Sequence, residues 1–216
     1  SDGSENNLKL VDITVEEQPT GEISLAAGVG TSGTTIGGGI NEKNFLGKGI
    51  NLNAQLELSE DKIKGQFVYS KPNFNYTDNT LFTSVKSSNT DLLKDFGYKT
   101  SEIGFSFGTE FEQYENLYFS PEIDLSLEDL ETNSKASTNL KKQAGNYEDF
   151  YFNYSLNYDL RNSTYKPSSG YKTSFYQKLP LVSSNNEITN TLVFTKHKKL
   201  SKESDMVGKA SFFISA

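Results

Sequence analysis

The sequence contains no cysteine and no tryptophan, and it has only one methionine and one histidine among 216 residues. Without cysteine, a disulfide framework and a thiolate metal site are both excluded. A serine-histidine-aspartate triad would have to use His197, and no other feature of the sequence supports one. The sequence therefore predicts neither an enzyme nor a bound metal or cofactor.

Long hydrophobic runs and positive charge are also scarce. No stretch approaches 18 consecutive apolar residues, so no transmembrane helix is expected. The formal net charge of −7 argues against nucleic acid as a partner, because binding to nucleic acid depends on Lys and Arg near the phosphates. Only 34% of the residues are hydrophobic, which by itself would favour a disordered chain.

The residues that are abundant argue against disorder. There are 15 Phe and 12 Tyr, whereas disordered chains are poor in aromatic residues. Asn, Ser and Thr together supply 64 residues. This combination predicts many short strands that carry aromatic side chains and are joined by polar turns.

Apolar and polar residues alternate along most of the chain. Segment 50–58 reads INLNAQLEL, with an apolar residue at every even position and a polar residue at every odd one. A period of two is typical of a β-strand and excludes an amphipathic helix. The same pattern predicts eleven strands, at 21–30, 34–43, 50–58, 61–71, 79–87, 99–109, 114–128, 148–160, 170–180, 186–197 and 205–215. Two longer connections are expected at 88–98 and 129–147.

The two faces of the predicted strands favour a membrane protein. One face carries Asn, Gln, Ser, Thr and Gly, and the other carries Leu, Ile, Phe and Tyr. This alternation is typical of an all-β fold, an antiparallel transmembrane β-barrel with its apolar face toward lipid and its polar face toward a wet lumen. Both long connections follow odd-numbered strands, which agrees with long loops on one side of a barrel. A soluble β-sandwich or solenoid remains the alternative.

The strand count predicts an incomplete barrel. Eleven is odd, whereas single-chain bacterial barrels have even strand numbers. Unpaired strand edges in lipid would cost several kcal/mol for each backbone group. Both ends of the chain look cut, and segment 8–16 reads as the last strand of a preceding domain. We therefore expect further strands beyond Ala216.

Several turns resemble those of the Omp85 superfamily of outer-membrane assembly proteins, in the same order and over nearly the whole chain. The matching segments are the hairpin Gly28-Val-Gly30-Thr-Ser-Gly33, the turn Asn44-Phe45-Leu46-Gly47-Lys48-Gly49, the turn Pro72-Asn73-Phe74, and Asp159-Leu160-Arg161 followed by Pro167-Ser-Ser-Gly170. The family's Arg-Gly-aromatic loop and its terminal aromatic strand are absent and would lie beyond Ala216.

The resemblance implies a fold and a function. About 11 of an expected 16 strands would be present, with residues 1–18 ending the last POTRA domain and residues 19–216 forming the N-terminal part of the barrel. The implied function is to fold and insert β-barrel proteins into the bacterial outer membrane, through a lateral seam at the first strand and without a cofactor. The implied partners are outer-membrane lipid, unfolded β-barrel client proteins and accessory lipoproteins bound by upstream POTRA domains. A polypeptide transporter of the same superfamily, such as a two-partner secretion pore, is the alternative.

The first predicted strand is the candidate site. Segment 21–30 combines glycines with two alanines and so offers little side-chain packing. Such an edge can open and pair with an incoming strand through its backbone groups. The residues expected to form this pairing edge are Ile23, Ser24, Leu25, Ala26, Ala27 and Gly28.

The remaining motifs favour structural roles. The run Gly28 to Gly33 matches G-x-G-x-x-G, but a strand follows it where a nucleotide site needs a helix, so we predict a tight hairpin. Turn roles are also expected for Asn44, Phe45, Gly47, Gly49, Pro167 and Gly170. Asp159 and Arg161 either pair inside the lumen or cap a turn, and a structural role is favoured. The basic cluster of Lys196, His197, Lys198, Lys199 and Lys202 is either solvated or contacts phospholipid headgroups.

Overall fold

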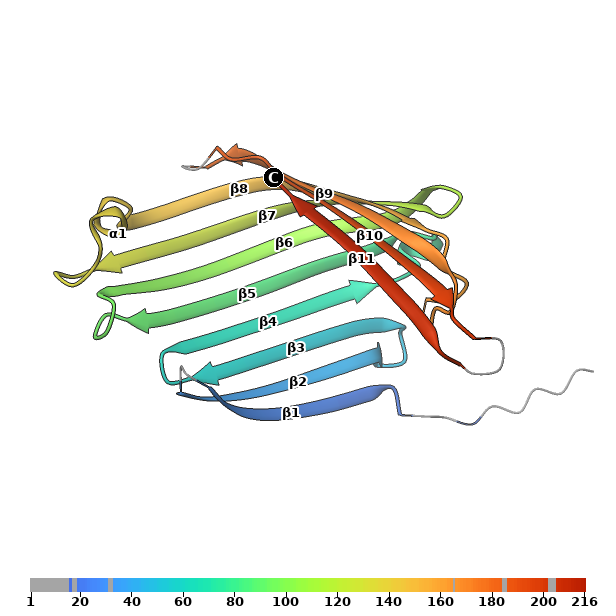
Figure 1. Ribbon diagram of the computed structural model, residues 1–216, viewed down its shortest axis with the longest axis horizontal. Helices are drawn as coiled ribbons and strands as arrows, with labels where there is room; N and C mark the ends of the chain where they lie inside the picture. The colour runs from blue at the N-terminus through green and yellow to red at the C-terminus, as the bar shows by residue number, and fades with distance from the viewer. Residues whose placement is uncertain (1–15, 17–18, 31–32, 165, 184–185, 202–204) are drawn as a thin grey trace, which may run out of the picture.

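The computed structural model describes residues 16, 19–30, 33–164, 166–183, 186–201 and 205–216. The predicted strand at 8–16 and the predicted end of a POTRA domain at 1–18 lie outside these residues, apart from Glu16. All eleven strands predicted from the alternation are confirmed, and they form one antiparallel sheet (Figure 1).

The bounds of six strands agree with the alternating segments to within two residues, and those of the other five differ by three to five residues at one or both ends. The strands are β1 Gly21–Gly30, β2 Gly33–Phe45, β3 Ile50–Ser59, β4 Lys62–Lys71, β5 Thr80–Leu92, β6 Tyr98–Tyr114, β7 Leu117–Thr132, β8 Gly145–Asp159, β9 Gly170–Val182, β10 Thr189–Lys199 and β11 Val207–Ser215. A 3₁₀ turn, η1 Phe74–Tyr76, follows β4, and a five-residue helix, α1 Thr138–Lys142, follows β7. No helix in the described part of the chain is long and apolar enough to cross a membrane.

The strands follow one another in the sheet in chain order. Each connection therefore returns to the neighbouring strand, and β1 and β11 are the two edges of the sheet. The sheet is curved, and β9 to β11 run at a steep angle across the direction of β1 to β4 (Figure 1). We call the rim at which β1 begins the near rim; the turns β2–β3, β4–β5, β6–β7, β8–β9 and β10–β11 lie there. The opposite rim is the far rim.

The register aligns apolar residues from strand to strand. Phe105 of β6 lies opposite Val85 of β5 and Leu125 of β7. Paired residues share a face, so these side chains form an apolar outer face. Phe105 is 46% exposed, whereas its polar neighbour Ser106 on the inner face is only 5% exposed. The polar face is therefore the more buried one, as expected for a sheet that curls toward it.

The two predicted long connections are shorter than expected. The connection predicted at 88–98 spans only 93–97, because β5 and β6 continue through polar residues whose backbones pair. The connection predicted at 129–147 spans 133–144. The near-rim connections 72–79 and 160–169 are longer than 93–97, so the prediction that long loops lie on one side is wrong. Backbone pairing extends these strands past the point where the apolar alternation ends.

The loops 93–97 and 133–144 interlock at the far rim. The backbone N–H of Asn133 donates to the Gly97 carbonyl at 2.8 Å, and the Asn133 side-chain Nδ2 donates to the Leu93 carbonyl at 2.8 Å. Gly97 has a φ of 76°, and a Cβ there would lie 2.3 Å from the Ala136 backbone nitrogen. The close approach of the two loops therefore requires glycine at this position.

Candidate functional site

Strand β1 is the least covered part of the sheet. Each of its ten residues is exposed, and β2 is its one partner strand within the described residues. The apolar side chains Ile23, Leu25 and Val29 are 75%, 85% and 86% exposed. The structure thus places the predicted pairing residues, Ile23, Ser24, Leu25, Ala26, Ala27 and Gly28, on an edge strand whose outward hydrogen-bonding groups have no described partner.

Packing between β1 and β2 depends on small residues. Leu25 lies opposite Gly38, and Ser24 lies opposite Gly39. A Cβ on Gly38 would lie 3.2 Å from Leu25 Cδ2, and one on Gly39 would lie 3.0 Å from Ser24 Oγ. A Cβ on Gly28 would have no atom within 4 Å. Side-chain contact across this pair is therefore sparse, and backbone hydrogen bonds supply most of the attachment of β1.

A hollow of about 780 Å³ adjoins this edge on the inner face. Its floor includes Ala26 and Gly28 of β1 and Gly37 and Gly39 of β2, and its walls carry polar side chains of β3 to β6: Gln55, Glu57, Lys64, Gln66, Lys86, Ser88 and Glu102. The glycines deepen the hollow because no side chain rises from the backbone there. The surface beside the edge is therefore both smooth and polar.

One ion pair lies among the polar residues that line this hollow. Lys86 Nζ lies 2.8 Å from Glu102 Oε1, and Ser126 Oγ donates to the same carboxylate at 3.1 Å. A Cβ on Gly104 would lie 2.2 Å from Lys86 Cε, so the lysine stem crosses β6 directly over that glycine. The described residues include no group of three or more His, Cys, Asp or Glu side chains placed to hold a metal ion.

Aromatic side chains form two groups of contacting rings on the outer face of β6 to β10. Phe119 contacts Phe111 with ring centroids 5.7 Å apart and Tyr154 at 5.9 Å. Nearer the near rim, Tyr171 contacts Tyr158 at 6.2 Å and Phe194 at 5.9 Å. Bands of this kind mark the level of the lipid-water interface in outer-membrane barrels.

The turn after β2 connects to the start of β1. The Asn44 side chain accepts a hydrogen bond from the Gly49 N–H at 2.7 Å, and Gly47 and Gly49 have φ values of 69° and 64°. Glu42 accepts from the Asn44 N–H at 2.7 Å and also from the Thr20 hydroxyl, just before β1. The predicted turn roles of Asn44, Gly47 and Gly49 are visible in these contacts, and Phe45 is the last residue of β2, opposite Ile50.

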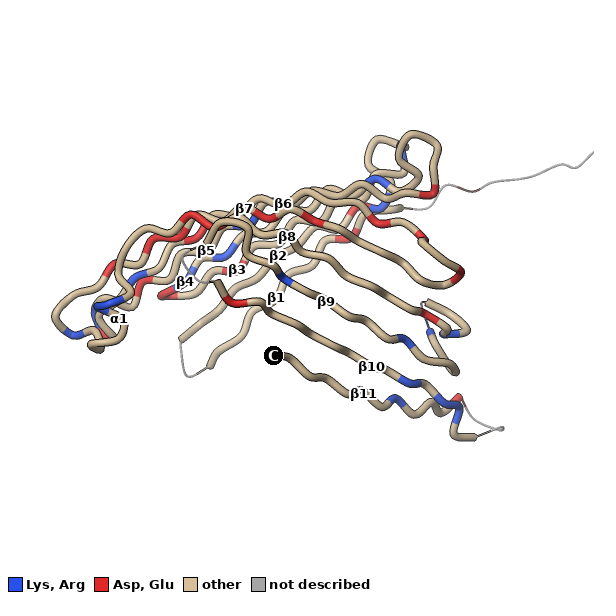
Figure 2. Tube along the Cα trace, turned by 90° about the horizontal axis from the view of Figure 1, so that it is seen from above, with Lys and Arg blue, Asp and Glu red and all other residues tan. Residues whose placement is uncertain are grey.

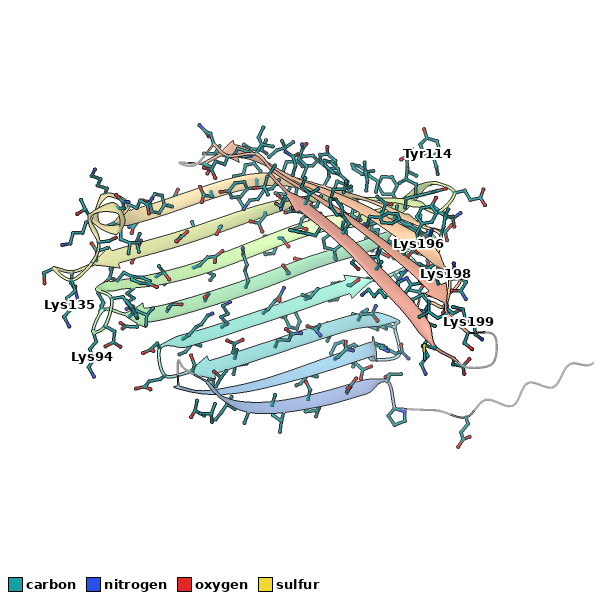
Figure 3. The ribbon with its side chains drawn as sticks, in the orientation of Figure 1. Lys94, Tyr114, Lys135, Lys196, Lys198 and Lys199 are labelled. Atoms are coloured by element: carbon teal, nitrogen blue, oxygen red, sulfur yellow. The ribbon has the colours of Figure 1, made fainter. Side chains whose placement is uncertain are left out.

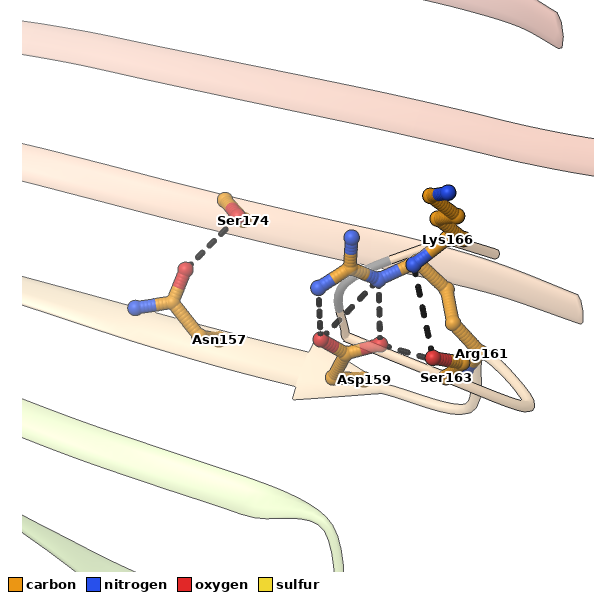
Figure 4. Close-up of polar contacts among 6 residues, drawn as sticks. All are labelled: Asn157, Asp159, Arg161, Ser163, Lys166 and Ser174. Atoms are coloured by element: carbon orange, nitrogen blue, oxygen red, sulfur yellow. Dashed lines mark hydrogen bonds and ion pairs between the residues drawn. The ribbon is translucent and has the colours of Figure 1, made fainter. Parts of the chain in front are cut away.

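The connection between β8 and β9 is held by a forked ion pair (Figure 4). Arg161 Nε donates to Asp159 Oδ1 at 2.8 Å, and Nη2 donates to Oδ2 at 2.6 Å. The two side chains are only 16% and 20% exposed. The hydrogen-bonded carboxylate of Asp159 raises the pKa of the Arg161 guanidinium. The pair also caps the turn, since the Arg161 N–H donates to Asp159 Oδ1 at 3.1 Å.

Asn162 closes the same connection, a role that no motif in the sequence predicts. Its side-chain oxygen accepts from the backbone N–H groups of Ser168 and Ser169 at 2.9 and 3.0 Å, directly after Pro167. Its own N–H donates to the Ser169 carbonyl at 3.1 Å. Gly170 then begins β9 with a φ of 94°.

Replacing Arg161 by alanine is expected to lower the free energy of unfolding by about 2 kcal/mol, because a forked hydrogen-bonded ion pair is lost. Arg161→Lys should lower the free energy of unfolding by less than Arg161→Ala does, because lysine keeps the positive charge but cannot form the two parallel hydrogen bonds. Urea unfolding of the refolded protein in detergent measures the change. Lys166→Ala, in the same connection, is the control because its side chain has no ion pair in the described structure. An equal loss in the R161A and K166A variants would show that only the net charge matters.

The comparisons with known proteins agree with this geometry. The family model for the Omp85 superfamily domain matches residues 44–214. The chain belongs to the Omp85 superfamily. BamA from Haemophilus ducreyi, in a crystal structure lacking POTRA domains 1–3, has the same fold, with a TM-score of 0.68 and 22% sequence identity over 93% of this chain. The match covers 42% of that BamA chain, so this chain spans about two fifths of its length. A search of curated proteins found no match.

Membership in the Omp85 superfamily confirms the predicted antiparallel β-barrel fold and supports an outer membrane protein. It also indicates that the outer face of the sheet lies toward lipid and the inner face toward the lumen. The structure brings the turn at Asn44 close to the start of β1. It does not bring the turn Asp159–Gly170 there, because that turn joins β8 to β9.

Proposed function

We propose that this chain belongs to an outer-membrane assembly factor that folds and inserts β-barrel proteins through a lateral seam at β1. The observation that carries the proposal is the loose attachment of this strand: its side chains pack sparsely on β2, where Ser24 and Leu25 lie opposite glycines and a Cβ on Gly28 would have no atom within 4 Å. Its proposed partners are unfolded β-barrel clients, outer-membrane lipid and accessory lipoproteins bound through upstream POTRA domains.

Backbone pairing would drive the reaction. A client strand that enters the membrane alone would leave its N–H and C=O groups unsatisfied, at several kcal/mol for each group. Pairing with β1 satisfies them along one side, and the side chains of a client strand need only alternate in polarity. Because the small side chains of β1 and β2 hold the edge loosely, the same strand can later exchange its partner. No cofactor is required for this mechanism, and none is proposed.

A polypeptide transporter of the same superfamily is the second candidate. The polar inner wall and the 780 Å³ hollow beside β1 favour it, since a translocating chain would need a wet surface. The smooth glycine floor of the hollow would also leave room for an extended backbone. The two functions differ in the destination of the substrate, which is the membrane for an assembly factor and the far side for a transporter.

Reconstitution of the full-length protein into phospholipid vesicles distinguishes the two candidates. We expect an added unfolded β-barrel client to fold faster than in empty vesicles, as measured by its heat-modifiable gel mobility. A soluble secreted polypeptide should remain outside the vesicles and sensitive to protease. Protection of that polypeptide, without any gain in client folding, would favour the transporter and contradict the assembly role.

A further inference from the structure

Strands β9 to β11 carry a charge opposite to that of the chain. Together they contain six lysines and no acidic residue, whereas the whole chain has a net charge of −7. The basic residues at the near-rim ends of these strands are visible in Figure 2. Figure 3 places Lys196, Lys198 and Lys199 at the same rim as Tyr114 and at the opposite rim from Lys94 and Lys135.

Two of these lysines lie on the outer face. Along β10, Leu192, Phe194, Lys196 and Lys198 are all exposed, and the alternating residue His197 is 8% exposed on the inner face. Lys196 lies opposite Tyr171 of β9 and Ala210 of β11, and Lys198 lies opposite Gly208. The outer face of β10 thus changes from apolar to basic within two residues of an aromatic side chain.

The neighbourhood of Lys196 and Lys198 fits the lipid-water interface. Tyr171, beside Lys196, belongs to the outer-face aromatic group with Tyr158 and Phe194. Tyrosine rings in outer-membrane barrels concentrate at headgroup level. Ala210, opposite Lys196, has only a methyl group, whereas the Leu200 side chain lies over Gly208, opposite Lys198, where a Cβ would lie 3.1 Å from Leu200 Cδ2. Residues two apart on a strand lie roughly 7 Å from one another, close enough for both ammonium groups to approach one headgroup.

Neither lysine has an acidic partner in the described part of the chain, whereas Lys199, Lys86 and Lys178 each have an acidic or aromatic partner. Lys199, on the inner face, lies 3.5 Å from Asp205 Oδ1, and Lys86 is paired with Glu102 at 2.8 Å. Lys178 lies over the Tyr151 ring at 3.5 Å. An exposed, unpaired pair of cations at the edge of an aromatic band is complementary to a phosphate in the headgroup layer.

We propose that Lys196 and Lys198 form a binding site for the phosphate of an anionic phospholipid headgroup in the leaflet at the near rim, with Tyr171 beside it. The site lies on β9 to β11, at the opposite end of the strand order from β1. It rests on the outer-membrane placement that follows from the family and not on the proposed seam, so it can fail or hold independently of the assembly function.

Titration of phosphatidylglycerol into the full-length protein in detergent tests the site, with bound lipid counted by native mass spectrometry. Each lysine near an anionic headgroup is worth about 1 kcal/mol, so the double variant Lys196→Gln, Lys198→Gln should weaken the tightest phosphatidylglycerol binding about 30-fold. Binding of zwitterionic phosphatidylcholine should not change. The charge-preserving variant Lys196→Arg, Lys198→Arg should keep the preference.

The matched control is Lys172→Gln, Lys209→Gln, which removes the same charge from the inner face of β9 and β11. Loss of binding in the K196Q/K198Q variant alone supports the site. An equal loss in both double variants would overturn it in favour of a net-charge effect, and unchanged binding in K196Q/K198Q would also overturn it. If the double variant does not fold, as judged by heat-modifiable mobility, each single variant should lose about fivefold, and no loss in either contradicts the site.

Discussion

Proline at position 26 or 27 is expected to reduce client assembly at least about tenfold in one of the two variants, while that variant still folds. In an antiparallel strand, consecutive N–H groups point to opposite edges. One of Ala26→Pro and Ala27→Pro therefore removes a bond to β2, and the other removes a donor from the outward edge. Proline is tolerated at an outward-facing edge position. The outward variant should keep its unfolding midpoint and still fail to pair a client strand.

Reconstituted vesicles and heat-modifiable mobility measure both properties in one preparation. Ala26→Val and Ala27→Val are the matched controls, because valine keeps the N–H and favours strand structure. They should retain assembly activity. If the correctly folded proline variant assembles clients at the normal rate, then β1 is not the pairing edge and the proposed function loses its main support.

Replacing Gly170 by alanine is expected to cost about 3 kcal/mol or more and to leave much of the protein unfolded. A Cβ at this position would lie 2.1 Å from the Leu160 carbonyl oxygen and 2.8 Å from Arg161 Cα, both backbone atoms that cannot move aside independently. The positive φ of 94° adds a further penalty for a residue with a side chain. The connection that carries the Asp159–Arg161 pair would have to rearrange.

Gly47→Ala is the control for the conformational part of this effect. Gly47 also has a positive φ, 69°, but a Cβ there has no atom within 4 Å. It should cost only about 1 kcal/mol. Urea unfolding in detergent and the folded fraction after refolding measure both variants. Equal losses of stability in G170A and G47A would mean that the close approach of Gly170 to the Leu160 carbonyl adds nothing to the cost of the substitution.

The fold could be predicted well because its main determinant is periodic. The run at 50–58 predicts β3 to within one residue, since its alternate apolar residues share one face of the strand. The alternation does not apply beyond the membrane. Asn89, Thr90 and Asp91 pair with Ser101, Thr100 and Lys99 although none of them is apolar, and this is why β5 extends past its predicted end.

The candidate site was predictable in part. Glycine and alanine content identified β1 as a weak strand, but the contacts of Ser24 and Leu25 with the glycines of β2 depend on register, which composition does not reveal. The Asn162 side chain accepts a hydrogen bond from a backbone N–H six residues further along its loop, and this depends on how the loop folds back. Lys198 and Lys199 point to opposite faces of the sheet because they are consecutive residues of β10. The basic cluster alone does not show which of its lysines face outward.

The three consecutive glycines of β2, Gly37, Gly38 and Gly39, have a mechanical consequence. Strands β6 to β8 are 15 to 17 residues long and are joined by interlocked loops or dense aromatic contacts, so that region should behave as a stiff plate. Strands β1, β3 and β4 are each 10 residues long. Because the glycines of β2 lie between β1 and β3, the first three strands should bend more easily than the rest of the sheet. A load applied at β1 would then be absorbed by local bending, leaving the shape of the rest of the wall unchanged.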